Sequence, residues 1–204
     1  SLEGHDYEIV DLPGTYSLSV IGDNCAIDEC IACNYLITNP PDLVINVVDA
    51  SNLERQLYLT AQLLEMQIPV VVALNMMDMA KRRGIHIDIA QLSRSLHCPI
   101  ISLTAIHGFG IAELRRALLV IPQTNSTLPY SFAPLLQGAL QTLTEKLAPK
   151  NLPRPWLALR LLEEDRLARH YTSAEELSHV TVLIQQLKNQ CGEEIDLLIA
   201  DARY

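Results

Sequence analysis

The sequence contains no run of about 18 to 20 consecutive apolar residues, the length that a helix needs to span a bilayer. Its first residues, SLEGHDYEIV, have neither the basic start nor the apolar middle of a signal peptide. We therefore expect the 204 residues to behave as a soluble protein.

Positive charge is also scarce. The chain has 15 Lys and Arg against 24 Asp and Glu, a net charge of -9, and the basic residues are scattered apart from the run Lys81-Arg82-Arg83. Binding along a phosphate backbone requires clustered Lys and Arg. We expect no nucleic-acid partner.

Cysteine is limited to five residues at uneven spacing, which favours reduced thiols in a chain large enough to fold without disulfides. Cys25, Cys30 and Cys33 do have the C-x4-C-x2-C spacing of plant-type iron-sulfur ligands. However, Cys30 and Cys33 lie in a helix-like run, so we interpret them as core thiols. The six histidines are isolated and predict no metal site.

What the sequence does have is a core-forming composition, with 49% hydrophobic residues, and a change of pattern at about Ile121. Before it, four short apolar runs predict buried strands: Glu8–Leu12, Leu43–Asp49, Val70–Asn75 and Ile100–Leu103. Helical patterns follow or separate them: Ile27–Ile37, Leu53–Met66, Ile89–Leu96 and Ile111–Leu119. This alternation predicts a doubly wound α/β domain over residues 1–122.

After a linker rich in Pro, Ser and Thr, only helical patterns remain, which predicts a small all-α domain over residues 129–204. The expected helices are Leu135–Leu147, Trp156–His170, Ala174–Cys191 and Ile195–Ala202. The acidic run Glu163-Glu164-Asp165 is interpreted as a solvated helix face. Asp49, which ends a strand, is interpreted as a cap for the helix that begins near Leu53.

Asp11 and Gly14 form the pattern D-x-x-G directly after the first predicted strand. A carboxylate there can hold a water molecule on Mg²⁺, and a glycine N–H can approach a terminal phosphate. Taken alone, the same residues are also typical of an ordinary turn.

Asn75 and Asp78 form the pattern N-x-x-D after the third predicted strand. An Asp carboxylate can accept hydrogen bonds from the N1–H and amine of guanine, while the Asn side chain can brace the surrounding loops. Met76 occupies the position of a frequent Lys, so its contact with a purine would be apolar. An isolated N-x-x-D could equally end a strand and cap a helix.

Thr104 and Ala105 follow the fourth predicted strand, in a small-residue loop whose N–H could reach the guanine carbonyl. Each motif is weak by itself. Their order along successive strands predicts a P-loop-NTPase-like G domain that binds GTP or GDP with Mg²⁺.

The strings DLPGTYSLS, INVVDASNLERQLYLT, PVVVALNMMDMA, WLALRLLEEDRLA and EEIDLLIADARY resemble the FeoB family of bacterial ferrous-iron transporters. The resemblance implies a GTPase domain and a GDI-like regulatory helical domain on the cytoplasmic face of the inner membrane, attached to a membrane pore region for Fe²⁺. It places Asp11 and Gly14 at the Mg²⁺ and γ-phosphate site, Asn75, Asp78 and Ala105 at the guanine site, and switch II from Thr15 to about Asp28. Oligomer formation through the cytosolic domains is a further possible partnership.

One departure from the family pattern affects catalysis. No Gly-x4-Gly-Lys phosphate loop occurs, so we expect a G domain that is N-terminally incomplete, starting at about its third strand. Thr15 follows the D-x-x-G, where many GTPases have Gln. The alternative function is therefore an interaction module that does not turn over nucleotide. A ribosome-assembly GTPase is disfavoured by the acidic charge.

Overall fold

The computed structural model describes residues 6–19, 27–120, 128–148, 151–192 and 194–203. The chain divides into two compact units, each made from two stretches of sequence. The first unit comprises residues 1–16 and 39–129, and the second comprises residues 17–38 and 130–204. We call them the α/β unit and the helical unit.

The α/β unit is built on a three-stranded parallel sheet in the order β1-β2-β3. The strands are β1 (Val44–Asp49), β2 (Val70–Asn75) and β3 (Ile100–Ser102). The first five residues of β2 are buried, as expected for a central strand covered on both faces. This arrangement confirms the predicted α/β fold class and three of the four predicted strands.

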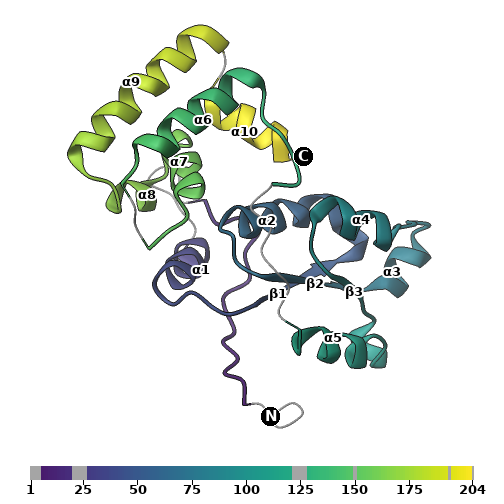
Figure 1. Ribbon diagram of the computed structural model, residues 1–204. Helices are drawn as coiled ribbons and strands as arrows, with labels where there is room; N and C mark the ends of the chain where they lie inside the picture. Colours follow the sequence, from purple (N-terminus) through teal and green to yellow (C-terminus); the bar gives the residue numbers. More distant parts are fainter. Residues whose placement is uncertain (1–5, 20–26, 121–127, 149–150, 193, 204) are drawn as a thin grey trace. The chain divides into compact units, whose positions relative to one another are not determined.

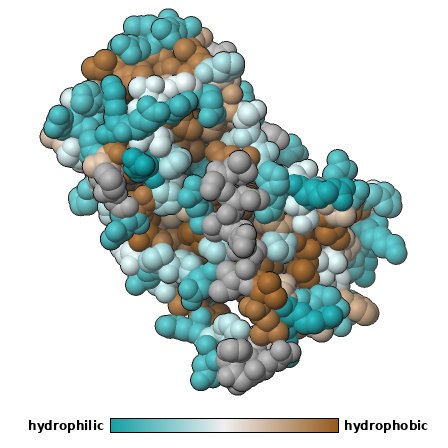
Figure 2. All heavy atoms as spheres, viewed as in Figure 1, coloured by the Kyte–Doolittle hydropathy of each residue, from teal (hydrophilic) through white to brown (hydrophobic). Residues whose placement is uncertain are grey.

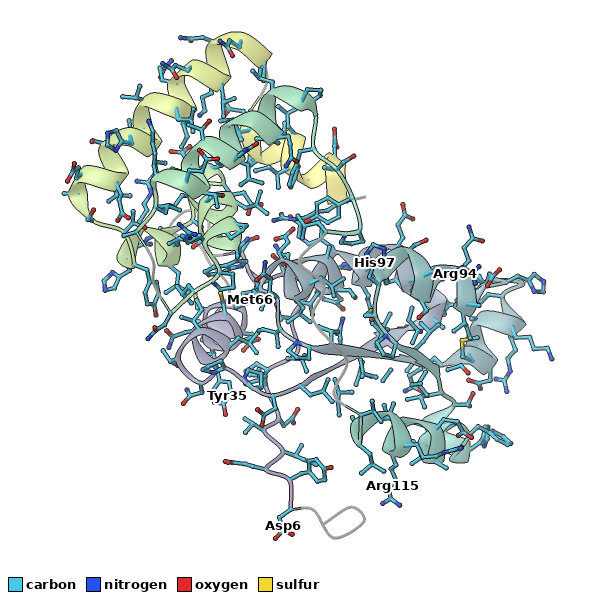
Figure 3. All side chains as sticks on the ribbon, in the orientation of Figure 1. Asp6, Tyr35, Met66, Arg94, His97 and Arg115 are labelled. Atoms are coloured by element: carbon cyan, nitrogen blue, oxygen red, sulfur yellow. The ribbon has the colours of Figure 1, made fainter. Side chains whose placement is uncertain are left out.

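Helices cover both faces of this sheet, with α2 and α4 on one side and α5 on the other (Figure 1). The elements are α2 (Leu53–Glu65), α3 (Met77–Arg82), α4 (Ile89–Leu96), α5 (Ile111–Leu118), and the 3₁₀ turns η1 (Ala50–Asn52) and η2 (Ala105–His107). The exposed Arg115 points away from the sheet, which leaves the apolar side of α5 for packing (Figure 3).

A buried polar contact joins the sheet to α2. The Asn46 amide donates a 2.8 Å hydrogen bond to the Thr60 hydroxyl. Burying either group alone would be costly, so the pair fixes the position of α2 against β1. As interpreted from the sequence, Asp49 is a cap. Its carboxylate accepts a 2.8 Å hydrogen bond from the Ser51 N–H at the start of η1, which leads into α2.

The predicted strand Glu8–Leu12 is wrong: these residues are extended but outside any strand, and residues 8–11 are exposed. A strand requires a neighbour that supplies ladder hydrogen bonds, and residues 8–12 form no ladder. The sequence also failed to indicate α3, which is only six residues long.

The helical unit consists of α1 (Ile27–Thr38), α6 (Pro134–Lys146), α7 (Arg154–Leu162), α8 (Arg166–His170), α9 (Ala174–Cys191) and α10 (Ile195–Arg203). Within it, α6 packs against α7 and α9, and α10 packs against α9. Helix α9 has the predicted bounds, because the Ser173 and Glu176 capping box starts it and Gly192, with a left-handed φ of 68°, ends it. Figure 2 shows hydrophilic side chains over much of the visible surface, with hydrophobic ones between them.

The predicted single helix Trp156–His170 is wrong. Helix α7 ends at Leu162, and Glu164 adopts a left-handed backbone conformation with a φ of 57°. The Asp165 carboxylate then caps α8 by accepting hydrogen bonds from the N–H groups of Leu167 and Ala168 at 2.8 and 3.2 Å.

The interpretation of the acidic run as a solvated face is also wrong for two of its three residues. Glu163 and Asp165 are 3% and 2% exposed and pair with Arg160 and Arg203, which are equally buried. Burial alone would raise the pKa of Glu163, but the charges of Arg160 and Arg203, with their hydrogen bonds, outweigh it and hold that pKa below its ordinary value. Only buried cations could compensate these carboxylates.

The compact units differ from the predicted ranges 1–122 and 129–204, because residues 17–38 belong to the helical unit. Helix α1 buries Ala32, Cys33 and Leu36, an apolar face that requires packing partners. The predicted linker cannot be compared, since residues 121–127 lie outside the described residues.

The expectation of five reduced cysteines is wrong for Cys30, which is disulfide-bonded. Cys33, Cys98 and Cys191 are free, and Cys25 lies outside the described residues. Among the described residues, no group of three or more His, Cys, Asp or Glu could hold a metal ion. In that same part of the chain, none of the helices combines the length and the apolar character that crossing a membrane requires.

Candidate functional site

A hydrogen bond joins two of the predicted motifs at the carboxyl end of the sheet. The Ala105 N–H donates a 3.0 Å hydrogen bond to the side-chain oxygen of Asn75. Asn75 ends β2 and Ala105 begins η2 just after β3, its parallel neighbour. The structure thus brings the N-x-x-D motif and the small-residue loop together, through the bracing role expected of Asn75.

The ends of these two strands are fastened together by the backbone as well. The Leu103 N–H donates to the Leu74 carbonyl at 2.7 Å, and the Met77 N–H donates to the Leu103 carbonyl at 3.2 Å. Ligand sites in open parallel sheets lie beyond the carboxyl ends of the strands, which is where these loops meet.

The loop that follows β3 closes on itself. Thr104 and Phe109 exchange backbone hydrogen bonds of 3.1 and 3.3 Å, and Gly108 and Gly110 have φ values of 71° and 81°. Both glycines occupy the left-handed region that other residues rarely adopt. Thr104 is itself buried, whereas Ala105 is exposed to solvent.

Asp78 and Met76 lie directly after Asn75. Met76 is half exposed in a left-handed conformation with a φ of 60°, and Asp78 lies in the first turn of α3. The Asp78 carboxylate is 3.9 Å from the Arg82 guanidinium, a loose pair whose Arg82 side chain is 71% exposed. Such a pair is weak, so the carboxylate can accept other donors.

Asp11 and Gly14 are not joined to this group. Both are exposed in an extended segment of the α/β unit, and no hydrogen bond or ion pair connects either to Asn75, Asp78, Thr104 or Ala105. A Cβ atom at Gly14 would meet nothing within 4 Å. Thr15 is half buried beside it, and the rest of the predicted switch II is described only at residues 16–19 and 27–28.

With this geometry established, comparison with known proteins identifies the family. Residues 1–118 match the family described as "Ferrous iron transport protein B", and residues 132–204 match "FeoB cytosolic helical domain". The chain belongs to the FeoB family. This confirms the resemblance found in the sequence.

Individual FeoB proteins agree with this assignment. The Fe(2+) transporter FeoB of Escherichia coli (strain K12) is 44% identical over 208 residues, covering 100% of this chain and 26% of that protein. The chain therefore spans about a quarter of its curated relative. The cytosolic domain of L. pneumophila FeoB matches with a TM-score of 0.85 at 40% identity, covering 100% of this chain and 78% of that one.

A solved S. thermophilus NFeoB, bound to GDP.AlF4- and K+, matches with a TM-score of 0.83 at 31% identity, covering 95% of this chain and 76% of that one. Together, these FeoB structures confirm a G-domain-like fold followed by a helical domain.

Sequence reasoning missed two features. Gly110 is required by close packing, and the only sign of it was the Gly-x-Gly pattern at Gly108 and Gly110. Arg160 is the centre of a buried ion cluster, and nothing in its local sequence distinguishes it from an exposed helical arginine.

Proposed function

We propose that this chain is the GTP-binding and GTP-hydrolysing regulatory part of a bacterial ferrous-iron transporter. The observation that supports it most directly is the Asn75–Ala105 hydrogen bond, which assembles two guanine-site motifs at one end of the sheet in a member of the FeoB family.

Recognition of guanine would rest on Asp78 and Ala105. The Asp78 carboxylate would accept the N1–H and amine of the base, donors that adenine does not offer in that arrangement. The Ala105 N–H would face the guanine carbonyl, although in this structure it donates to Asn75. Base binding would therefore share or exchange this donor, with Asn75 keeping the loop in place and Thr104 supporting it from beneath.

The phosphate side would involve Asp11 and Gly14. An exposed single carboxylate suits an ion held through water rather than a cage of protein ligands, which is how Mg²⁺ commonly binds beside nucleotide phosphates. Bound Mg²⁺ would stabilise negative charge on the transferred phosphoryl group. Gly14 has space around it for its N–H to approach a phosphate oxygen.

GTP binding and hydrolysis would act as a regulatory signal for iron uptake. We propose that the chain works on the cytoplasmic face of the inner membrane, with the membrane pore region of the same polypeptide as its partner and with oligomer formation through the cytosolic parts. The composition, at a net charge of -9, continues to disfavour nucleic acid.

The test is a change of base specificity in the full-length protein. Asp78→Asn should weaken GTP binding by about 2 to 4 kcal/mol, because a charge-assisted double contact is lost. The same variant should gain affinity for xanthosine triphosphate, whose 2-oxo group matches the new amide donor. Titration calorimetry with GTP, ATP and xanthosine triphosphate measures all three affinities.

Asp88→Asn is the matched control, since Asp88 is an exposed carboxylate that caps α4 away from these motifs. Unchanged GTP affinity in Asp78→Asn would contradict the guanine assignment. Absence of binding in the wild-type protein would instead support the alternative, an interaction module without nucleotide turnover.

A further inference from the structure

The chain just after the D-x-x-G motif is held inside the helical unit. The division between the two units falls between Tyr16 and Ser17, so residues 17–19 fold with the helices. Leu18 is 2% exposed. The Ser17 hydroxyl accepts a 3.0 Å hydrogen bond from the Ser19 N–H, which folds the segment into a local turn.

Arg160 of α7 makes the polar contacts that hold this turn. One of its terminal nitrogens donates to the main-chain carbonyl of Leu18, and the other donates to the Ser19 hydroxyl at 2.9 Å. The Leu18 contact uses the backbone, so it does not depend on the side chain at that position.

The Arg160 guanidinium is itself fixed in orientation. It lies 3.0 Å from Glu163 and 3.2 Å from Asp165, and all three side chains are at most 2% exposed. Arg203 holds the Glu163 carboxylate from the other side with contacts of 2.5 and 3.1 Å. A planar guanidinium with several paired donors has little freedom to follow a moving segment.

On the other side of the unit boundary, Tyr16 is held by the α/β unit. The Arg55 guanidinium of α2 lies 4.0 Å from the centre of the Tyr16 ring, a cation–π contact. The chain is therefore attached to α2 at Tyr16 and to α7 at Leu18. Since an extended chain spans at most about 3.6 Å per residue, Gly14 can be no more than about 14 Å from the Leu18 attachment.

We propose that Arg160 is a positioning residue for the D-x-x-G segment: through Leu18 and Ser19 it sets how far Gly14 can move toward a terminal phosphate. This inference rests on the proposed function. GTP would require that approach and GDP would not, because only GTP has the γ-phosphate. Loosening the attachment should then favour GTP relative to GDP.

Two variants of the full-length protein test the attachment. Arg160→Lys keeps the charge beside Glu163 and Asp165 but cannot supply the same set of donors, and Ser19→Ala removes only the hydroxyl contact. We expect Arg160→Lys to shift the ratio of GTP to GDP affinity toward GTP by about tenfold, the scale of one hydrogen bond to a charged group. Ser19→Ala should shift it in the same direction by less.

Amide hydrogen exchange without nucleotide gives a second readout. Peptides containing residues 15–19 should exchange faster in both variants than in the wild-type protein. The control is Ser173→Ala, which removes the cap of α9 in the same helical unit without touching residues 17–19, and which should change neither the ratio nor that exchange.

The positioning role is overturned if guanine nucleotides bind while both readouts stay unchanged in Arg160→Lys and Ser19→Ala. It is also overturned if Ser173→Ala shifts the ratio as strongly, since the effect would then reflect general loss of stability. Faster exchange with no nucleotide binding by any of the proteins overturns the proposed function, and the role of Arg160 in it.

Discussion

A Cβ atom added to Gly110 would lie 2.1 Å from the main-chain oxygen of Ser102, at the end of β3. Real Cβ atoms do not approach that closely, and Gly110 also has a φ of 81°. We therefore expect Gly110→Ala to displace the loop after β3 and to destabilise the α/β unit by about 3 kcal/mol, combining steric overlap with left-handed strain. Urea unfolding followed by circular dichroism measures the loss.

Gly108→Ala separates the two causes. Gly108 has a φ of 71°, but a Cβ atom there would meet nothing within 4 Å. This variant should cost only the left-handed strain, about 1 to 2 kcal/mol. Equal losses in the two variants would show that the contact with Ser102 is unimportant.

The buried carboxylate of Glu163 predicts a loss of stability in acid. Because its pKa is lowered in the folded state, its contribution is complete above its ordinary pKa of 4.5 and declines as the pH falls through the folded value. The free energy of unfolding of the helical unit should therefore fall between about pH 5 and pH 3. Urea titrations at several pH values measure this slope.

Glu163→Gln should reduce that slope and also cost about 3 to 5 kcal/mol at neutral pH, because the charge of Arg203 loses its buried partner. Glu145→Gln, at an exposed position of α6, should change neither quantity. If the slope survives in Glu163→Gln, the acid sensitivity arises from other groups.

The free cysteines should differ in reactivity. Burial raises the pKa of both Cys33 and Cys98 to about 11, whereas Cys191 is only half buried. At about pH 8, roughly one in a thousand of the buried thiols is ionised, so iodoacetamide should modify Cys191 first. Mass spectrometry of the peptides measures this order. Labelling of Cys98 before Cys191 in the folded protein would contradict it.

Thr15 should have a modest effect on hydrolysis. Its hydroxyl reaches less far than the Gln amide that many GTPases place after D-x-x-G. We expect Thr15→Ala in the full-length protein to change kcat by less than about tenfold, or about 1.4 kcal/mol. Single-turnover hydrolysis at saturating enzyme measures the rate. A loss of about a hundredfold with GTP affinity unchanged would make Thr15 a catalytic residue.

Elements with complete local patterns were predictable from the sequence. Strand β2 is a continuous apolar run, and α9 has a capping box at one end and Gly192 at the other, so their bounds were predicted correctly. The order of the motifs also placed Asn75 and Ala105 together, because both follow adjacent parallel strands.

What the sequence could not reveal depends on distant partners. Residues 8–12 have the apolar character of a strand, but ladder pairing is not a local property. Glu163 resembles a solvated residue until Arg203, 40 positions later, lies beside it. The left-handed turn at Glu164 is equally invisible, because no Gly or Asn marks it.

The composition of the helical unit from two separated stretches has a consequence for biosynthesis. Residues 17–38 leave the ribosome before any of residues 130–204 with which they pack. At typical rates of about 5 to 20 residues per second, α1 waits roughly 5 to 18 seconds while residues 39–129 are made. During that interval the apolar side of α1, including Cys33, has no native cover from the later helices, so the nascent chain should be a substrate for chaperones that bind exposed apolar segments.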